Sequence, residues 1–290
     1  MNFTRLSALL LACAAVSAFG GEAPQGHLFI IGGGHRGPEL MKEYIRLAGG
    51  PAHANILVLP MASGDGDTTG MEMAAEFRDL GVASARSLFI TRAQAMTPEI
   101  LDQFRGVTGV YFTGGDQVRI TRELVGTPVQ AKLKELYRSG VVIGGTSAGA
   151  AIMSKVMLTG DERLNKDTVN GFVFIRRNNV VVVDGLGFLE TVIVDQHFIR
   201  RKRLNRLISV VLEHDPHVGV GIDEATAVIV SPDSTFRVMG NGSVMVLDAS
   251  QTEHIRDDEK GNMGFDGMRM HVLLDGDEFD MRQMKPVSRK

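Results

Sequence analysis

A strand pattern passes directly into a helix start in the stretch VVIGGTSAG, which occupies residues 141–149. The apolar residues 141–143 are typical of a buried strand, and the small residues that follow permit a sharp turn around Ser147. In the pattern G-x-S-x-G such a turn exposes a serine hydroxyl at the carboxyl end of the strand, and the first amides of the next helix face the same point. We predict that Ser147 is a nucleophile and that a helix runs from Ala148 to Met157.

Alternating strand and helix patterns surround this stretch. Apolar runs typical of buried strands occupy residues 27–31, 55–60, 87–90 and 109–113, and helix patterns begin at Pro38, near Met71 and at Thr97-Pro98. Thr97 suits the N-cap of a helix and Pro98 its first position. Buried strands that alternate with helices predict an α/β fold with a mostly parallel central sheet, covered by helices on both faces.

Beyond Val180 the strand candidates follow one another closely. They occupy residues 180–183, 191–194, 218–222, 227–230, 236–239 and 244–247, with one helix from about Arg200 to Glu213. We expect these C-terminal β-strands to extend the same sheet or to form a small antiparallel one. Because no linker-like stretch separates the two parts, we expect residues 21–290 to form a single domain.

The N-terminus has the anatomy of a signal peptide. Arg5 precedes a short apolar run that ends at Phe19, and small residues at 16–18 suit a signal peptidase. The run is shorter than the roughly 20 apolar residues of a membrane span. We expect residues 1–20 to be removed and the protein to be exported to the periplasm or the medium. Lipid anchoring at Cys13, the only cysteine, is the less favoured alternative.

Composition narrows the class of function. The chain has 290 residues, 44% hydrophobic and 22% charged, with a formal net charge of −3. A mildly acidic globular protein lacks the basic surface that nucleic-acid binding needs. Without Cys13 the mature chain has no cysteine, which excludes disulfides, thiolate nucleophiles and cysteine-ligated metals.

A serine nucleophile needs a base held by a third group. Among the histidines, His197 stands out because it ends the apolar strand 192–194, so it should lie at the same sheet edge as Ser147. A further strand, 218–222, leads into Asp223 and Glu224, either of which could hold His197. The order serine, histidine, acid differs from that of the α/β-hydrolase superfamily, which we therefore exclude.

Two further segments follow strands at this edge. The loop TGGDQ, residues 113–117, brings paired glycines near the nucleophile, and the amide of Gly115 suits a second oxyanion donor beside Ala148. The segment 195–207 reads DQHFIRRKRLNRL and is rich in arginine. Guanidinium groups beside His197 suit the capture of substrate carboxylates, and they disfavour the protonated imidazole.

One glycine motif points elsewhere at first sight. Residues 32–37 read GGGHRG, which fits the dinucleotide pattern G-x-G-x-x-G after a strand. The acidic residue expected about 20 positions further on is missing, so we exclude a nicotinamide cofactor. We interpret these glycines as turns that allow close approach at the carboxyl edge of the sheet.

Four motifs in this order resemble a known family. They are FTGGDQ (112–117), GGTSAGA (144–150), the run that begins DQHF at Asp195, and GIDEATA (221–227). Together they resemble the serine peptidase family that contains cyanophycinase and aspartyl dipeptidase. The resemblance implies a fold like that of class I glutamine amidotransferases, with serine in place of cysteine, and no metal or cofactor.

The resemblance also implies roles for residues. Ser147 would be the nucleophile, His197 the base and Glu224, rather than Asp223, the orienting acid. The substrate site would be lined by Gln117, Asp195, Gln196, Arg201, Arg203 and Arg206. The last three arginines cannot all aim at one point from a regular helix, so we predict an irregular start to this segment or contacts with successive substrate units.

The function that the resemblance implies is that of an exopeptidase. Cyanophycin is a polyaspartate whose β-carboxyls carry arginine, and the family releases β-aspartyl-arginine from its chain end. One alternative is a peptidase for other aspartyl or isoaspartyl peptides on the same fold, and another is a catalytically silent binding protein. The expected partners are the substrate and, as one option, a second copy in a homodimer, with no nucleic acid and no membrane span.

Overall fold

The computed structural model describes residues 24–164 and 171–288. The expected signal peptide at 1–20 and Cys13 lie outside these ranges. Within them, none of the helices is both long and apolar enough to cross a bilayer.

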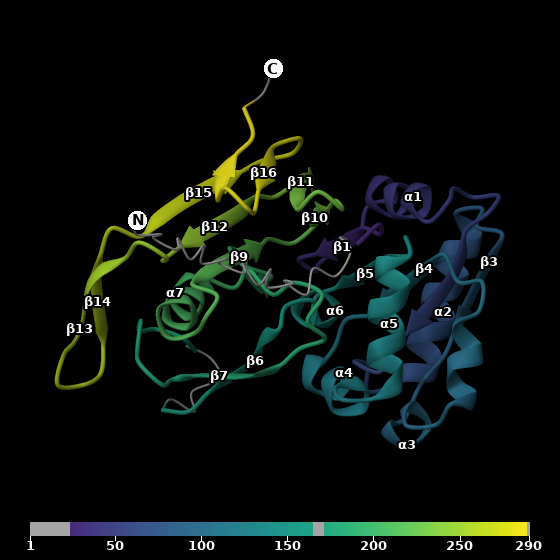
Figure 1. Ribbon diagram of the computed structural model, residues 1–290, viewed down its shortest axis with the longest axis horizontal. Coiled ribbons are helices and arrows are strands. Elements are labelled where there is room, and N and C mark those ends of the chain that lie inside the picture. The colour runs from purple at the N-terminus through teal and green to yellow at the C-terminus, as the bar shows by residue number, and fades with distance from the viewer. Residues whose placement is uncertain (1–23, 165–170, 289–290) are drawn as a thin grey trace, which may run out of the picture.

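The largest sheet of the described ranges has the strand order β17-β16-β11-β10-β1-β5-β4-β2-β3 (Figure 1). Its parallel half consists of β1 (Leu28–Ile31), β2 (Asn55–Leu59), β3 (Ser84–Ser87), β4 (Gly109–Phe112) and β5 (Val142–Thr146). Antiparallel strands continue it beyond β1: β10 (Thr226–Val230), β11 (Thr235–Gly240), β16 (Glu278–Asp280) and β17 (Lys285–Pro286). The predicted α/β fold is confirmed.

Strand residues alternate between two cores, because successive side chains of a strand point to opposite faces. In β1, Phe29 and Ile31 pack with α1 (Pro38–Leu47) and α2 (Gly66–Asp79), whereas Leu28 and Ile30 face the opposite layer. That layer contains α3 (Arg92–Ala95), η1 (Glu99–Phe104), α4 (Gln117–Leu124), α5 (Pro128–Arg138) and α6 (Ala148–Ala151). Both faces of β1, β2, β4 and β5 are therefore buried, which explains their apolar runs, whereas the edge strand β3 is polar and partly exposed.

A second sheet adjoins the first. It has the order β15-β12-β9-β8, built from β8 (Ile193–Gln196), β9 (Val218–Ile222), β12 (Val244–Asp248) and β15 (Arg269–Leu273). The helix α7 (Leu204–Glu213) covers it with an apolar face. The expected extension of the first sheet is therefore present, whereas the second sheet is mixed rather than antiparallel, because β8 and β9 pair in parallel.

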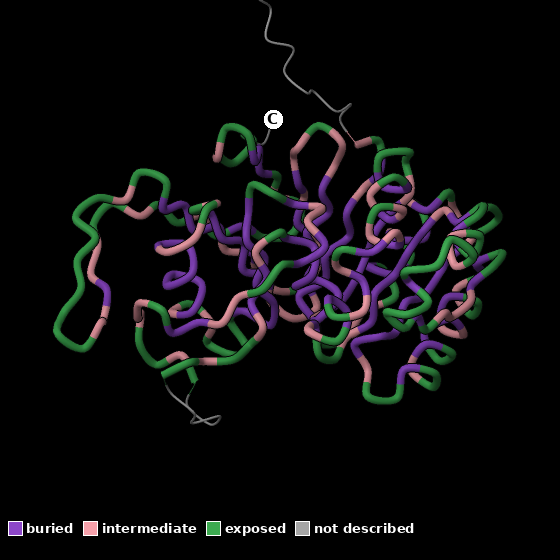
Figure 2. The backbone as a smooth tube through the Cα atoms, turned by 60° about the horizontal axis from the view of Figure 1, so that its bottom comes forward, coloured by how far each residue is buried: buried purple, intermediate pink, exposed green. Residues whose placement is uncertain are grey.

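Two hairpin-like ladders complete the described chain. One pairs β6 (Val156–Glu162) with β7 (Val180–Asp184), and the other pairs β13 (Glu253–Asp257) with β14 (Met263–Asp266). Figure 2 shows β13–β14 as an exposed arm, whereas buried segments run through the middle of the molecule.

The helix that follows Ser147 is shorter than predicted. It ends at Ala151 rather than at Met157, and β6 begins at Val156. The carbonyls of Ile152 and Met153 accept hydrogen bonds from residues 186–189 instead of continuing a helix. The turn into β6 is therefore fixed by a distant loop that the local pattern could not reveal.

Two other local predictions were wrong. The third strand is Ser84–Ser87, which lies before the apolar run at 87–90. Thr97 caps no helix, since its hydroxyl donates to the carbonyl of Gln94; the capped helix there is α3, with Thr91 as its N-cap. Residues 99–104 form a 3₁₀ helix instead.

Candidate active site

Ser147 lies on the tight turn between β5 and α6. Its backbone has φ 53° and ψ −107°, a conformation that is unfavourable for a residue with a side chain. A Cβ at Gly145 would lie 2.6 Å from the carbonyl oxygen of Gly149, and a Cβ at Gly149 would overlap the carbonyl of Phe112. The turn therefore requires the small residues of the G-x-S-x-G pattern on both sides of the serine.

A continuous hydrogen-bonded chain starts at this serine. Its Oγ lies 2.9 Å from Nε2 of His197, and Nδ1 of His197 lies 2.6 Å from Oε1 of Glu224. His197 follows β8 and Glu224 follows β9, so the three side chains come from the carboxyl ends of three strands. The geometry suits a hydroxyl that donates to Nε2 and an Nδ1–H that donates to the carboxylate.

The sequence did not show whether Asp223 or Glu224 is the acid that contacts His197, and the structure distinguishes them. Asp223 does not face the imidazole: its Oδ1 accepts a hydrogen bond of 3.0 Å from the backbone N–H of Arg200. It therefore fixes the turn that follows His197. Sequence reasoning missed this role, because nothing in the pattern distinguishes two adjacent acids.

Burial and charge set the proton affinity of this chain. Desolvation lowers the pKa of His197, the hydrogen bond to Glu224 opposes this, and Arg201 and Arg203 lower it further. The pKa of Glu224 is also lowered, chiefly by its bond to His197. The His197 side chain is 8% exposed and that of Glu224 32%. The imidazole is therefore kept neutral and able to accept a proton.

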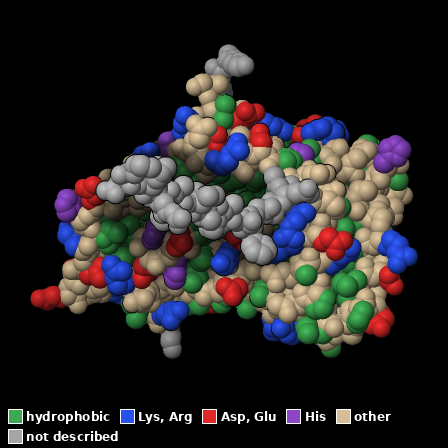
Figure 3. Space-filling model, in the orientation of Figure 1, with side chains coloured by type: hydrophobic (Ala, Val, Ile, Leu, Met, Phe, Trp, Pro, Cys, Tyr) green, Lys and Arg blue, Asp and Glu red, His purple; other side chains and the backbone are tan. Residues whose placement is uncertain are grey.

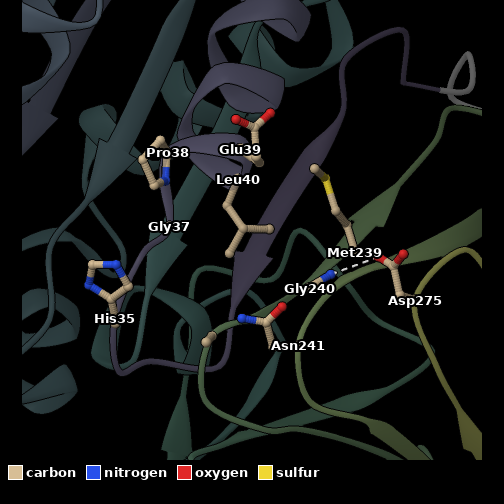
Figure 4. A pocket seen from close by; sticks show the side chains of 10 residues that line it. His35, Gly37, Pro38, Glu39, Leu40, Met239, Gly240, Asn241 and Asp275 are labelled. Atoms are coloured by element: carbon tan, nitrogen blue, oxygen red, sulfur yellow. Dashed lines mark hydrogen bonds between the residues drawn. The ribbon is translucent and has the colours of Figure 1, made fainter.

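A hollow of about 330 Å³ opens beside the acid (Figure 4). Its lining includes His35, two residues after Gly33, and Ala225, the neighbour of Glu224. Figure 4 shows Glu39 and Asp275 from opposite walls of this hollow, with the carboxylate of Asp275 bonded to the amide of Gly240. The hollow therefore adjoins the chain next to Glu224, and Ser147 itself is partly exposed.

The predicted oxyanion donors lie on either side of the serine. A Cβ at Gly114 would lie 3.5 Å from that of Ser147, so this loop packs directly against Ser147. Gly115 has φ 136°, and a Cβ there would overlap the carbonyl of Ala62. Among the described residues, the amides of Gly115 and Ala148 donate no hydrogen bond. Both are therefore available to a ligand oxygen.

Gln117 begins α4 and is buried. Its side-chain amide donates to the carbonyls of Leu158 (2.8 Å) and Thr159 (2.6 Å) in β6. The amide nitrogen of Gln117 is therefore already hydrogen-bonded within the protein, and these bonds connect the loop 113–117 to β6.

Asp195 and Arg206 face each other rather than open space. Nε of Arg206 donates to Oδ2 of Asp195 at 2.7 Å, and Nη2 donates to Oδ1 in a second, short bond. Their side chains are 1% and 2% exposed, and the ring of Phe172 lies 5.1 Å from the guanidinium. In this arrangement neither residue reaches a substrate, so both support the site from within.

The other two arginines are placed differently. Nη1 of Arg203 donates to the backbone and side-chain oxygens of Gln196, at 2.6 and 2.7 Å, and burial lowers its pKa to about 9. Arg201 is exposed. The irregular start predicted for this segment is present, because α7 begins only at Leu204 and Lys202 has a positive φ. The three arginines predicted to bind substrate therefore differ: Arg206 is buried against Asp195, Arg203 is bonded to Gln196, and Arg201 is exposed.

Lys and Arg side chains are interspersed with Asp and Glu over the visible face (Figure 3). Among the described residues, no three His, Cys, Asp or Glu side chains are grouped as metal ligands.

Comparison with known proteins identifies close counterparts. The model of peptidase family S51 matches residues 28–238. The cyanophycinase of Synechococcus elongatus is 35% identical over 269 residues, which are 89% of this chain and 80% of the relative. The cyanophycinase of Trichormus variabilis is 33% identical over 270 residues, or 90% and 88% of the two chains. That of Geminocystis herdmanii is 30% identical and is covered over 96% of its length.

Solved structures share the fold. A peptidase from an acI-B1 actinobacterium superposes with a TM-score of 0.64 at 23% identity, covering 89% of this chain and 98% of that one. A putative peptidase E protein from Listeria monocytogenes gives a TM-score of 0.51 at 18% identity, covering 75% and 99%.

Proposed function

This chain belongs to peptidase family S51 and is a serine-type peptidase, and on that premise we propose that it hydrolyses cyanophycin to β-aspartyl-arginine dipeptides through Ser147, His197 and Glu224. The observation that carries the mechanism is the unbroken chain of hydrogen bonds from the serine to the carboxylate. The substrate follows from the relatives, all three of which are cyanophycinases.

The first step is attack on an aspartyl amide carbonyl. The Ser147 hydroxyl gives its proton to Nε2 of His197 as the Oγ–C bond forms, and Glu224 stabilises the resulting imidazolium through Nδ1–H. The carbonyl oxygen takes up negative charge between the amides of Gly115 and Ala148. Collapse of this intermediate breaks the C–N bond, and the imidazolium protonates the leaving amine. Water then repeats the sequence and releases the acyl group.

The cationic segment after His197 supplies substrate recognition. Each cyanophycin unit carries a free carboxylate on its arginine, and a guanidinium binds a carboxylate through paired N–H groups. Arg201 is exposed and suits this contact directly, and Arg203 lies between it and the buried pair Asp195–Arg206. Gln196 borders the same region through its bonds to Arg203.

The test is incubation of the purified protein with cyanophycin and mass spectrometry of the products. We expect β-aspartyl-arginine to be the main product, with much slower hydrolysis of small aspartyl and isoaspartyl dipeptides. Rapid cleavage of the dipeptides with the polymer left intact would replace this substrate by the alternative class. No cleavage of either substrate would leave only the binding protein.

We also propose that the protein acts outside the cytoplasm. The sequence of residues 1–20 supports this, and those residues lie outside the described ranges. Cell fractionation with N-terminal sequencing of the mature chain tests it. Recovery in the cytosol with an intact N-terminus would contradict export.

A further inference from the structure

The segment Ile31–Gly34, where β1 leaves the sheet, contacts every member of the proposed triad. Its first three carbonyls accept, in order, the backbone N–H groups of Ser147 (3.0 Å), His197 (2.7 Å) and Ala225 (2.9 Å), the residue that follows Glu224. Three consecutive peptide units therefore fix the backbones of the nucleophile, the base and the acid. We call this segment the β1 turn.

The three residues held in this way share an unusual backbone. Their φ angles are 53° for Ser147, 48° for His197 and 52° for Ala225. A positive φ is disfavoured for residues with a side chain, and it persists only where the surroundings hold it. The carbonyls of the β1 turn supply one such contact at each of the three positions.

The glycines of the β1 turn lie directly under the catalytic side chains. Gly33 has φ 105°, and a Cβ there would lie 2.9 Å from Nδ1 of the His197 ring and would overlap its Cε1 and Nε2. Gly34 has φ 70°, and a Cβ there would lie 2.8 Å from Cβ of Glu224. The imidazole therefore rests on a position that has room only for glycine.

We propose that the β1 turn is the positioning element of this active site and that Gly33 sets the reach of His197 to Ser147. The proposal rests on the proposed serine mechanism. It assigns the GGG sequence at 32–34 to catalysis through contact with the triad, not to a cofactor. Any side chain at position 33 lifts the ring away from the hydroxyl, with which it makes a 2.9 Å hydrogen bond.

The test compares Gly33→Ala with Gly140→Ala in the full chain. Gly140 has φ 106°, nearly the same as Gly33, but nothing lies within 4 Å of a Cβ there. The control therefore places an alanine at nearly the same positive φ without the overlap with His197. The readout is the rate at which a fluorophosphonate labels Ser147, which needs no knowledge of the natural substrate.

We expect Gly33→Ala to label about 100-fold more slowly, since a displacement of about 1 Å has an effect of that order. Gly140→Ala should label at the wild-type rate. With cyanophycin, Gly33→Ala should lower kcat and leave KM nearly unchanged. Equal labelling of Gly33→Ala and wild type would overturn this inference alone. A wild-type protein that is not labelled would refute the serine mechanism, and this inference with it.

A second measurement covers a variant that folds poorly. The loss of Tm caused by Gly33→Ala is measured in the wild-type background and again in His197→Ala, where the ring is absent. A smaller loss in His197→Ala supports contact through the ring. Equal losses, or failure to fold in both backgrounds, would show that the cost lies in the backbone and would overturn the proposal.

Discussion

The substitution Arg206→Met separates a supporting arginine from a substrate-binding one. It removes one partner of the Asp195–Arg206 pair, whose side chains are 1% and 2% exposed. Leaving one charge of a buried pair unpaired costs about 3–5 kcal/mol. Asp195 retains the Gln196 amide at 2.7 Å and Arg203 at 3.8 Å, so we expect the lower end, about 3 kcal/mol.

Thermal unfolding measures this cost. For a protein of this size, a loss of 1 kcal/mol in the free energy of unfolding lowers Tm by about 2–4 °C. The Tm of Arg206→Met should therefore be about 6–12 °C below that of the wild type. The double variant Asp195→Leu with Arg206→Met removes both charges and should recover most of the loss. The control Arg201→Gln changes an exposed arginine of the same segment and should leave Tm nearly unchanged. An unchanged Tm for Arg206→Met together with a large rise in KM would refute the supporting role.

Three other predictions concern the catalytic chain. Glu224→Gln should lower kcat by at least about 100-fold, because the neutral amide no longer stabilises the imidazolium. The control Asp223→Asn keeps an oxygen that can accept the Arg200 N–H, so its kcat should change little. Comparable losses of kcat in both variants would contradict the assignment of Glu224 as the acid. The kcat/KM of the wild type should fall as the pH drops through the lowered pKa of His197, with half its maximum below pH 6.5; a midpoint at or above 6.5 speaks against a desolvated base. Arg201→Gln removes a charge that lowers this pKa, so the acidic limb of the profile should move to higher pH; movement to lower pH would reverse our account.

Four of the five parallel strands could be predicted from the sequence because they are buried on both faces; the edge strand β3 is polar and partly exposed, and its place was predicted wrongly. Runs such as 55–60 and 141–145 carry that burial in their composition. The strand at 253–257 could not be predicted, since all its residues are exposed and charged side chains predominate. Likewise the start of β6 at Val156 overlapped the end of the predicted helix 148–157, because the contacts of Ile152 and Met153 after α6 come from residues 186–189.

The site divides in the same way. The strand-to-helix turn marks Ser147, and the polar residues after β8 and β9 mark the segments that meet it. The partner of each polar side chain, however, is set by the tertiary structure and not by the local pattern. Asp195 and Arg206 bind each other, and Asp223 accepts the backbone N–H of Arg200 in the turn after His197. The three glycines after β1 were a visible signal, but their partners lie more than a hundred residues away.

The activity of Ser147→Ala on cyanophycin tests the central claim most directly. The substitution removes only the hydroxyl, so the protein should keep its Tm. We predict that its kcat falls by at least about a thousandfold, as expected when the nucleophile of a serine enzyme is removed. A folded Ser147→Ala protein that releases β-aspartyl-arginine within tenfold of the wild-type rate would contradict the mechanism.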